Sequence, residues 1–417
     1  MADSSPLSFN VYLDGTGNSQ LYDTHLGEET NVSRLYQADT SIKTDLSYNV
    51  PGVRNSYDAQ YDRQDLSYQS EAIYLDGVGS QQNDSVGKII EGATGLGLNT
   101  RVEEAYNAIV AFHNKYPGQE IEINLIGFSR GSAAARDLAN KIIDEGIPVR
   151  DADFDPYVFS SDIEVEVTYL IPPDDPHINK LVIFDTVVSS GYPLSDTHIG
   201  TDVRIHPSVD STSHLIAANE YRESFKLTSA IREGDNSNIQ QTLFAGAHSQ
   251  IGGGYANDIL AAGPLGVAYN SLEQAGVNLA PLDLQDRINL QLYNEVIEQP
   301  AMVEQLLIDS RIKQDGTTFT GEPDQDHAFQ LVPEQGRQFT DELGNNLHLP
   351  QPMQVAVDFM DATRDVLGID NDNLKIDSDI VADTQLRIDN LNDTLVNSRP
   401  SAEYIESLDL QPVEITP

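Results

Sequence analysis

The stretch that decides the fold is Ile121–Asn140, "IEINLIGFSRGSAAARDLAN". It opens with alternating and then continuous apolar residues, passes through Gly-Phe-Ser-Arg-Gly, and continues with alanines at helical spacing. This pattern predicts a strand, a tight turn and a helix. Such a turn drives its central residue towards φ > 0 and needs small neighbours, which Gly127 and Gly131 supply around Ser129. We therefore predict a nucleophile elbow, although the G-x-S-x-G spacing alone also occurs by chance.

The rest of the first 280 residues predicts further strands that each end on a polar residue. Candidate strands run into Asp14, Asp76 and Asp185, and a final one, "QTLFAGAHSQIGGGY", is predicted to end at His248. Ligands of open α/β sheets bind outside the carboxyl ends of parallel strands. We therefore expect these four side chains to emerge with Ser129 at one edge of a sheet.

Helical patterns alternate with the candidate strands. Apolar residues at helical spacing over 102–112 predict a helix that Pro117-Gly118 stops, and "HLIAANEYRESFKLT" (214–228) is also predicted to be a helix. Residues 19–70 are polar and are expected to form long excursions with little regular structure. Alternating strands and helices predict an α/β fold, with a mostly parallel central sheet flanked by helices.

The pattern of predicted elements changes after about residue 280. Residues 282–312 and 351–367 have helical patterns, the first interrupted at Pro300, whereas 313–350 are loop-like and the remainder is acidic and irregular. We predict a catalytic domain over 1–280 and an appended region of helices and loops over 281–417 that packs on it or caps it.

Composition excludes several classes of protein. The chain has no Cys, so disulfides, thiolate metal sites and cysteine nucleophiles are ruled out. With 66 Asp and Glu against 24 Lys and Arg, the net charge of −42 repels phosphate backbones, and no nucleic-acid partner is expected. A solvated surface adapted to salt accounts for this acidity. The start, "MADSSPLSFN", lacks the features of a Sec signal, and no apolar run reaches membrane-span length, so synthesis in the cytoplasm is expected.

Ser129, Asp185 and His248 follow one another in the chain order of an α/β-hydrolase triad. The serine hydroxyl needs a base, and the imidazole needs a carboxylate to set its tautomer and stabilise its charged form. Other readings exist for each residue by itself. Asp185 could merely cap a helix or turn, and His248 could be a hydrogen-bonded histidine at a strand end.

The turn "DGTGN" follows the first strand and has no phosphate-binding spacing, because it lacks both G-x-G-x-x-G and the Walker lysine. We expect it to form an oxyanion hole, in which the N–H of Gly15 or Thr16 acts with that of Arg130 and Asp14 orients the loop. An ordinary tight turn is the alternative. A metal site from Asp14 and Asp76 has no ligand spacing to support it, so neither metal nor cofactor is predicted.

Taken together, these residues resemble the DUF2235 family, which includes the Tle1-type phospholipase effectors of bacterial type VI secretion systems. The resemblance covers residues 8 to about 280 in the family's order. The matching segments are "YLDGTGN" (12–18), "TNVSRLY" (30–36), "YLDGVGS" (74–80), "GLGLNTRVEEAY" (95–106), "LIGFSRGSAAAR" (125–136), "VIFDTVVSSG" (182–191), "HLIAANEYRESF" (214–225) and "GAHSQIGGGY" (246–255).

The resemblance implies an α/β-hydrolase that cleaves glycerophospholipid acyl esters, with its triad on Ser129, Asp185 and His248. It also implies an antibacterial effector that a type VI system delivers to the target periplasm, with a secretion spike protein and a cognate immunity protein as partners. One departure is Gln250, which stands where the family usually has Asp. The resemblance does not extend to the acidic C-terminal third, so it implies nothing there about substrate access or delivery.

The leading hypothesis is therefore a serine ester hydrolase, namely a phospholipase A that contacts membrane surfaces transiently. The alternatives are a carboxylesterase or lipase acting on another ester, and a binding module that keeps the hydrolase fold without catalysis. A surface this acidic opposes adsorption to anionic bilayers at low salt, which leaves room for another ester substrate.

Overall fold

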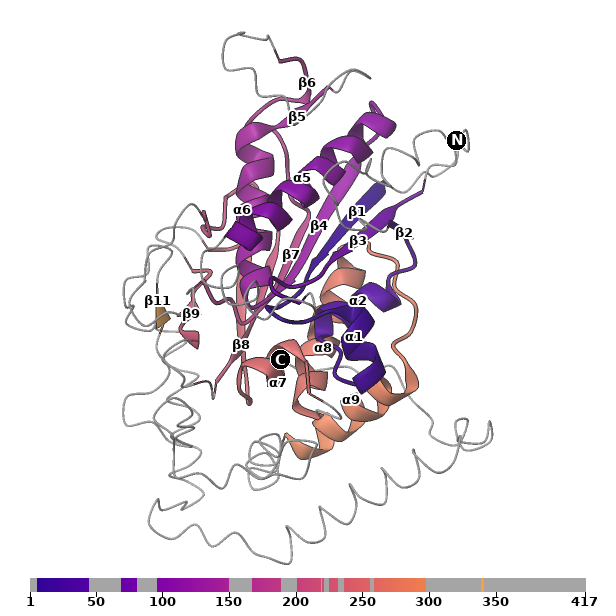
Figure 1. Ribbon diagram of the computed structural model, residues 1–417, viewed down its shortest axis with the longest axis vertical. Coiled ribbons are helices and arrows are strands. Elements are labelled where there is room, and N and C mark those ends of the chain that lie inside the picture. The colour runs from indigo at the N-terminus through magenta and orange to yellow at the C-terminus, as the bar shows by residue number, and fades with distance from the viewer. Residues whose placement is uncertain are drawn as a thin grey trace, which may run out of the picture.

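The computed structural model of the chain describes residues 6–44, 69–80, 96–149, 167–188, 201–218, 220, 225–231, 236–255, 259–297 and 339–340. Its centre is a seven-stranded sheet whose neighbouring strands all run parallel (Figure 1). In spatial order the strands are β10 (Ile239–Phe244), β8 (Thr212–Ala217), β7 (Lys180–Phe184), β4 (Ile121–Phe128), β1 (Leu7–Leu13), β3 (Glu71–Leu75) and β2 (Ile42–Thr44). The predicted parallel α/β sheet is confirmed.

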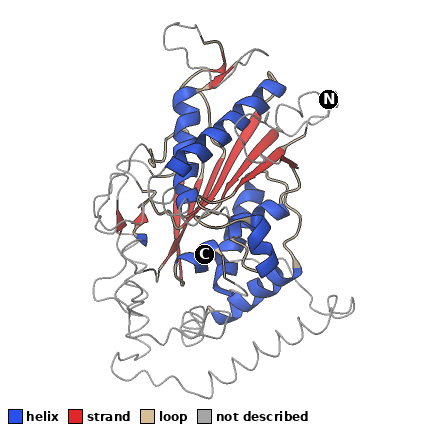
Figure 2. Cartoon of the chain, viewed as in Figure 1, coloured by secondary structure: helices blue, strands red, loops and turns tan. Residues whose placement is uncertain are grey.

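Helices cover both faces of this sheet, as Figure 2 shows. On one face lie α5 (Leu96–Lys115) and α6 (Arg130–Glu145). The opposite face carries α2 (Asn31–Ala38), α7 (His248–Gly252), α8 (Ile259–Gln274) and α9 (Leu284–Val296), with α1 (Gln20–Leu26) beside them. Since both faces are covered, the strands read as near-continuous apolar runs.

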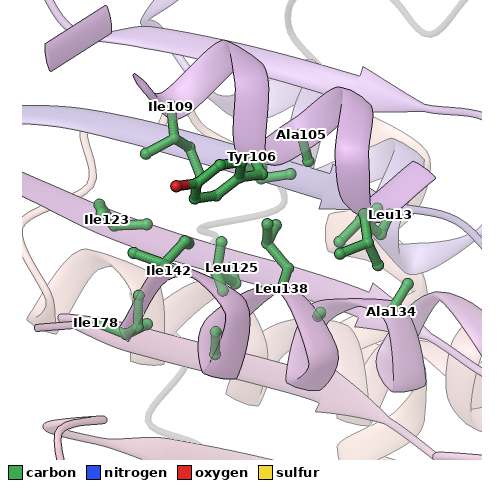
Figure 3. Close-up of a cluster of buried hydrophobic side chains, with 14 of the residues drawn as sticks. Leu13, Ala105, Tyr106, Ile109, Ile123, Leu125, Ala134, Leu138, Ile142 and Ile178 are labelled. Carbon is green, nitrogen blue, oxygen red and sulfur yellow. The ribbon is translucent and has the colours of Figure 1, made fainter. Parts of the chain in front are cut away.

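The core is divided into two hydrophobic clusters by the alternation of side chains along each strand. On β4, Leu125 points to the cluster under α5 and α6, whereas Ile126 and Phe128 point to the cluster under α2, α7 and α8. Figure 3 shows Leu125 beside Leu138 and Ile142 of α6 in the first cluster, with Ala134 next to Leu13. The alanines after the elbow thus let α6 lie close against the sheet.

The strand order changes direction between β1 and β4. From β1 the chain passes to β2 and β3 on one side, and then crosses to β4, β7, β8 and β10 on the other. The carboxyl ends of these strands lie in register, with Leu13 opposite Gly127 and Phe128 opposite Phe184. Binding crevices of doubly wound sheets form at such a switch point, and the elbow and the "DGTGN" turn both lie there.

The prediction of little regular structure over 19–70 is wrong for its first part. Residues 20–26 and 31–38 form α1 and α2, and residues 42–44 form the edge strand β2. Thr30 caps α2, because its side chain accepts a hydrogen bond from the Ser33 N–H. This cap, together with the burial of Val32, Leu35 and Tyr36, lets a polar sequence form a helix. Residues 45–68 lie outside the described residues.

The predicted helix over 214–228 is also wrong. Residues 212–217 form β8, which lies between β7 and β10 and is buried over its whole length. A short apolar run such as Leu215–Ala217 fits a buried strand and a buried helix equally well, and the flanking strands decide the outcome here. The final strand, β10, ends at Phe244, and His248 is the first residue of α7 rather than a strand end.

The helix α8 was also not predicted from the sequence. It is apolar on most sides and contains Pro264, so it shows neither amphipathic spacing nor an uninterrupted pattern. The predicted helix after residue 282 is confirmed as α9, which packs on α8. The predicted loop-like segment and second C-terminal helix fall outside the described residues, apart from β11 (Phe339–Thr340), so the division at residue 280 stays a prediction.

Four short strands of the described residues lie outside the central sheet. β5 (Ile147–Pro148) pairs antiparallel with β6 (Tyr169–Ile171), and β11 pairs parallel with β9 (Leu227–Thr228). Within the described part of the chain, no helix combines the length and the apolar character needed to cross a membrane.

Candidate active site

Ser129 lies in the turn between β4 and α6 with a left-handed backbone, at φ 57° and ψ −121°. Its glycine neighbours are required by close backbone contacts. A Cβ atom at Gly127 would lie 2.5 Å from the Gly131 carbonyl oxygen, and one at Gly131 would lie 2.1 Å from the Leu13 carbonyl oxygen. The Ser129 N–H donates to the Phe184 carbonyl at 3.0 Å, which ties the turn to β7. This geometry is that of a strained strand–turn–helix elbow.

Asp185 follows β7 and is fully buried, with a second left-handed backbone at φ 43°. Its N–H donates to the Leu215 carbonyl at 2.8 Å, and its Oδ1 accepts the Ala217 N–H at 2.9 Å. Its other oxygen, Oδ2, lies 2.7 Å from Nδ1 of His248. Both carboxylate oxygens of Asp185 therefore have a donor, and one of these donors is an imidazole.

His248 begins α7 and is buried, with 3% of its surface exposed. Since Nδ1 faces a carboxylate, Nδ1 carries the proton, and Nε2 is the nitrogen left to accept one. The backbone N–H of His248 donates to Oε2 of the buried Glu220 at 3.2 Å. The ring itself contacts two phenyl rings, those of Phe128 and Phe225, at centroid distances of 4.7 and 4.8 Å. These contacts fix the position of both the backbone and the side chain of His248.

The structure brings Asp185 and His248 into direct contact, while Ser129 adjoins them through its neighbours. Phe128, which precedes Ser129, packs on the His248 ring, and the Val187 N–H lies 3.4 Å from the Ser129 carbonyl. Between the described side chains of Ser129 and His248 no hydrogen bond is formed. Contacts of this kind often tighten only when substrate is bound.

The "DGTGN" turn lies beside the elbow, as expected for an oxyanion hole. The Gly15 N–H already donates to Asp14 Oδ1 at 2.6 Å, whereas the Thr16 N–H has no acceptor among the described residues. Arg130 begins α6, so its N–H lies at the positive end of the helix dipole. Of the two N–H groups expected from this turn, the Thr16 N–H is the one that is free to meet a ligand.

Asp14 anchors this turn to two neighbouring elements. Its Oδ2 accepts hydrogen bonds from the hydroxyls of Thr30 and Tyr74, and its Oδ1 accepts the Gly15 N–H. Burial raises the pKa of Asp14 to about 7, and these three hydrogen bonds limit the rise. The supporting role expected of Asp14 thus has a physical basis, since its carboxyl joins β1, β3 and the cap of α2.

The turns after β1 and β3 pack directly on each other. The Gly17 N–H donates to the Val78 carbonyl and the Gly77 N–H donates to the Asn18 carbonyl, both at 3.0 Å. Asp76 belongs to this pair of turns, and its carbonyl accepts a hydrogen bond from Arg101 at 3.1 Å. Over the described residues, no group of three or more His, Asp or Glu side chains could hold a metal ion.

Gln250 has a local structural role. Its Oε1 accepts the Ala247 N–H at 2.9 Å, so it closes the first turn of α7. Sequence reasoning did not identify Thr30, Tyr74 or Glu220 as parts of the site. They lie between 16 and 60 positions from the residues that they contact, and no local spacing marks such pairs.

Taken as chemistry, the site offers a hydroxyl on a strained turn, an imidazole bonded to a buried carboxylate, and backbone donors at a helix N-terminus. These groups are those of acyl transfer through a serine nucleophile.

Comparison with known proteins identifies one family model, "T6SS, Phospholipase effector Tle1-like, catalytic domain", which matches residues 8–160 and 166–271. No curated protein matches the chain. Among solved structures, the chain is similar to "Structure of the Tle1 effector bound to the VgrG spike from the Type 6 secretion system" at 16% identity and a TM-score of 0.44, covering 78% of this chain and 83% of that one.

Two further structures are more distant. An uncharacterized protein from Pseudomonas aeruginosa is 17% identical with a TM-score of 0.39, over 73% of this chain and 53% of that one. Zea mays acyl-protein thioesterase 2 is 12% identical with a TM-score of 0.26, over 59% of this chain and 88% of that one. These scores are low, so family membership depends on the family model.

Proposed function

The chain belongs to the family of type VI secretion phospholipase effectors with a Tle1-like catalytic domain, and we propose that it is a phospholipase A. In this proposal Ser129 is the nucleophile, His248 is the base, and the Asp185 carboxylate orients His248. The observation that carries this proposal is the 2.7 Å contact between His248 Nδ1 and Asp185 Oδ2, next to a serine at φ 57°. A buried carboxylate on one imidazole nitrogen makes the other nitrogen a base.

In the reaction, the Ser129 oxygen attacks the carbonyl carbon of an acyl ester while His248 Nε2 takes the hydroxyl proton. The tetrahedral oxyanion is stabilised by the N–H groups of Thr16 and Arg130, at the N-terminus of α6. When the carbon–oxygen bond to glycerol breaks, His248 returns its proton to the leaving oxygen and a lysophospholipid departs. Water then attacks the acyl–Ser129 ester, again with His248 as base, and releases a fatty acid.

The strained elbow supports this mechanism. The left-handed backbone at Ser129 is strained, and strained conformations of this kind cluster at active sites. The position of α6 directly behind Ser129 adds the electrostatic field of a helix N-terminus to the place where negative charge develops.

Delivery and partners are proposed by analogy with the family. We assign the protein to secretion by a type VI system into the periplasm of a target cell, with a spike protein as its carrier and an immunity protein in the producing cell. The family description names a type VI phospholipase effector, and one similar structure is described as an effector bound to a VgrG spike.

The test is hydrolysis of mixed phospholipid vesicles, followed by mass spectrometry of the products and by labelling with a fluorophosphonate probe. The wild-type protein should release fatty acid and lysophospholipid in equal amounts and should bind one probe molecule. Ser129→Ala should fold, take up no probe and lose about 10⁵-fold or more in kcat.

Other results select other functions. Release of headgroups instead of fatty acids would mean that the enzyme does not cut the acyl ester. Probe labelling without phospholipid hydrolysis would favour an esterase acting on another substrate. A wild-type protein that neither binds the probe nor hydrolyses any ester would be a binding module with a hydrolase fold.

A further inference from the structure

A second histidine, His214, lies behind the acid of the proposed triad. It belongs to β8 and is fully buried. In the sheet it pairs with Ile183 of β7 on one side and with Gln241 of β10 on the other. Its ring therefore lies in the layer that supports the end of β7, where Asp185 begins its turn.

The hydrogen bonds of His214 determine which ring nitrogen carries the proton. Nδ1 lies 2.8 Å from Gln241 Oε1. The same Oε1 accepts the backbone N–H of Ala230 at 3.0 Å, which only an oxygen can do. The amide oxygen of Gln241 thus faces the ring, so Nδ1 is a donor and Nε2 of the neutral ring is an acceptor.

That acceptor faces Thr186, the residue directly after Asp185. Nε2 lies 3.2 Å from Thr186 Oγ1 and 3.4 Å from the Thr186 N–H. The Thr186 carbonyl in turn accepts the Thr228 N–H at 2.9 Å. Thr186 is fully buried, so its position is set by these contacts. They hold the chain immediately after a backbone at φ 43°, a strained conformation that persists only where the surroundings enforce it.

We propose that His214 is a positioning residue for catalysis: it holds Thr186, and thereby keeps the Asp185 carboxylate where it meets His248. This inference rests on the proposed function, because it assigns Asp185 the part of the triad acid. A small displacement of the Asp185 turn would lengthen the bond to His248 Nδ1, which measures 2.7 Å. A displacement of about 1 Å at a reacting group costs on the order of 10²-fold in rate.

Two substitutions of His214 separate positioning from simple core filling. The side-chain amide of Asn reaches about as far as Nδ1, and that of Gln about as far as Nε2. His214→Asn keeps the bond to Gln241 and removes the acceptor of the Thr186 hydroxyl. His214→Gln gives up Gln241 and can still accept from the Thr186 hydroxyl. Each variant gives up the contact with one of these two residues, Gln241 or Thr186, and both should lower the Tm.

The measured quantities are kcat and KM on a short soluble ester and the proton NMR signal of the His248 Nδ1–H. The Asp185→Asn variant, which changes the partner of this proton, identifies the signal in the spectrum. We expect His214→Asn to lose about 10²-fold in kcat with little change in KM, and to shift or broaden that signal. His214→Gln should stay within about tenfold of the wild-type kcat and keep the signal.

Thr186 provides the same test from the other side of the contact. Thr186→Val keeps the shape of the side chain and removes the hydroxyl, whereas Thr186→Ser keeps the hydroxyl. The valine variant should resemble His214→Asn, the serine variant should resemble wild type, and the double variant His214→Asn/Thr186→Val should lose no more than either single variant. Should His214→Asn fail to fold, the Thr186 pair decides the question.

The proposal is overturned if His214→Asn, or Thr186→Val in its place, keeps wild-type kcat with an unchanged His248 signal. It is also overturned if the Asn and Gln variants lose kcat only in proportion to their loss of Tm. Ser129→Ala distinguishes the two levels of the argument. If that variant stays active, the proposed function fails; if it is inactive while His214→Asn is fully active, only the positioning role fails.

Discussion

The ring of Phe128 lies 4.7 Å from the imidazole of His248, inclined at 35° to it. Phe128 also directly precedes Ser129, so one buried side chain adjoins both the proposed nucleophile and its base. The same ring fills the space beside two glycines. A Cβ atom would come within 2.6 Å of it at Gly15 and within 2.1 Å at Gly252. Phe128 therefore contacts the elbow, the "DGTGN" turn and α7, and a change in any of them should alter the position of His248.

This contact predicts that Gly252→Ala lowers kcat. The new methyl group would collide with the Phe128 ring and push it towards His248. Gly263→Ala in α8 is the matched control, because its methyl group would meet the Tyr293 ring at 2.3 Å, and neither glycine has a positive φ. Both variants should lose about 1–3 kcal/mol of stability by overpacking. Only Gly252→Ala should also lose about 10-fold or more in kcat on a soluble ester. Equal kcat values in the two variants would contradict this coupling.

The choice of Asp185 as acid predicts a loss of about 10⁴-fold in kcat for Asp185→Asn, because an amide can favour the wrong His248 tautomer. Asp202→Asn is the control. The Asp202 carboxylate accepts from Arg204 Nε at 2.8 Å, and that pair lies at the surface. Asp202→Asn should therefore keep kcat within a fewfold of wild type. If Asp202→Asn were the crippling variant instead, the acid would come from the loop after β7.

Asp14 predicts a particular dependence of stability on pH. Burial raises its pKa from 3.8 to about 7. Between these values the folded protein holds a proton at Asp14 that the unfolded chain has released, so this residue makes stability fall as the pH rises through the window. Three pKa units correspond to at most about 4 kcal/mol.

The measurement for Asp14 is the Tm of wild type and of Asp14→Asn between pH 4 and 8. Wild type should lose Tm more steeply than the variant over this range. Asp137 and Asp286, whose pKa values burial raises to about 6, titrate in both proteins and cancel in the difference. Parallel curves would show that Asp14 is already ionised throughout.

The net charge of −42 predicts a salt dependence that varies with the lipid. Repulsion should slow the approach to anionic vesicles at low ionic strength and weaken as salt screens it, since the Debye length at 0.1 M is about 10 Å. Hydrolysis of anionic vesicles should therefore rise with NaCl, while hydrolysis of phosphatidylcholine vesicles should change less and that of a short soluble ester least. A steady fall with salt on anionic vesicles would point to a local cationic docking site instead.

Local sequence patterns predicted the elements that have a clear apolar run, helical spacing or glycine motif of their own. The apolar runs of β1, β4 and β7, the amphipathic spacing of α5 and the glycines around Ser129 all correspond to elements of the structure. The same patterns failed for β8, whose apolar run fits either a helix or a strand, and for α8, which has no polar face. β8 is buried over its whole length and α8 over most of its length, and such burial removes the periodicity on which the prediction depends.

The sequence by itself determined the α/β class, the elbow and the order of Ser129, Asp185 and His248, because these depend on residue types at short spacing. Only the tertiary structure decided that His248 opens α7 instead of ending a strand, and that its Nδ1 meets Asp185 63 positions away. The supports of the site, from Thr30 and Tyr74 around Asp14 to His214 behind Thr186, were likewise visible only in three dimensions. The physical reason is that a parallel sheet brings the ends of distant strands together, and no local periodicity records which residues meet there.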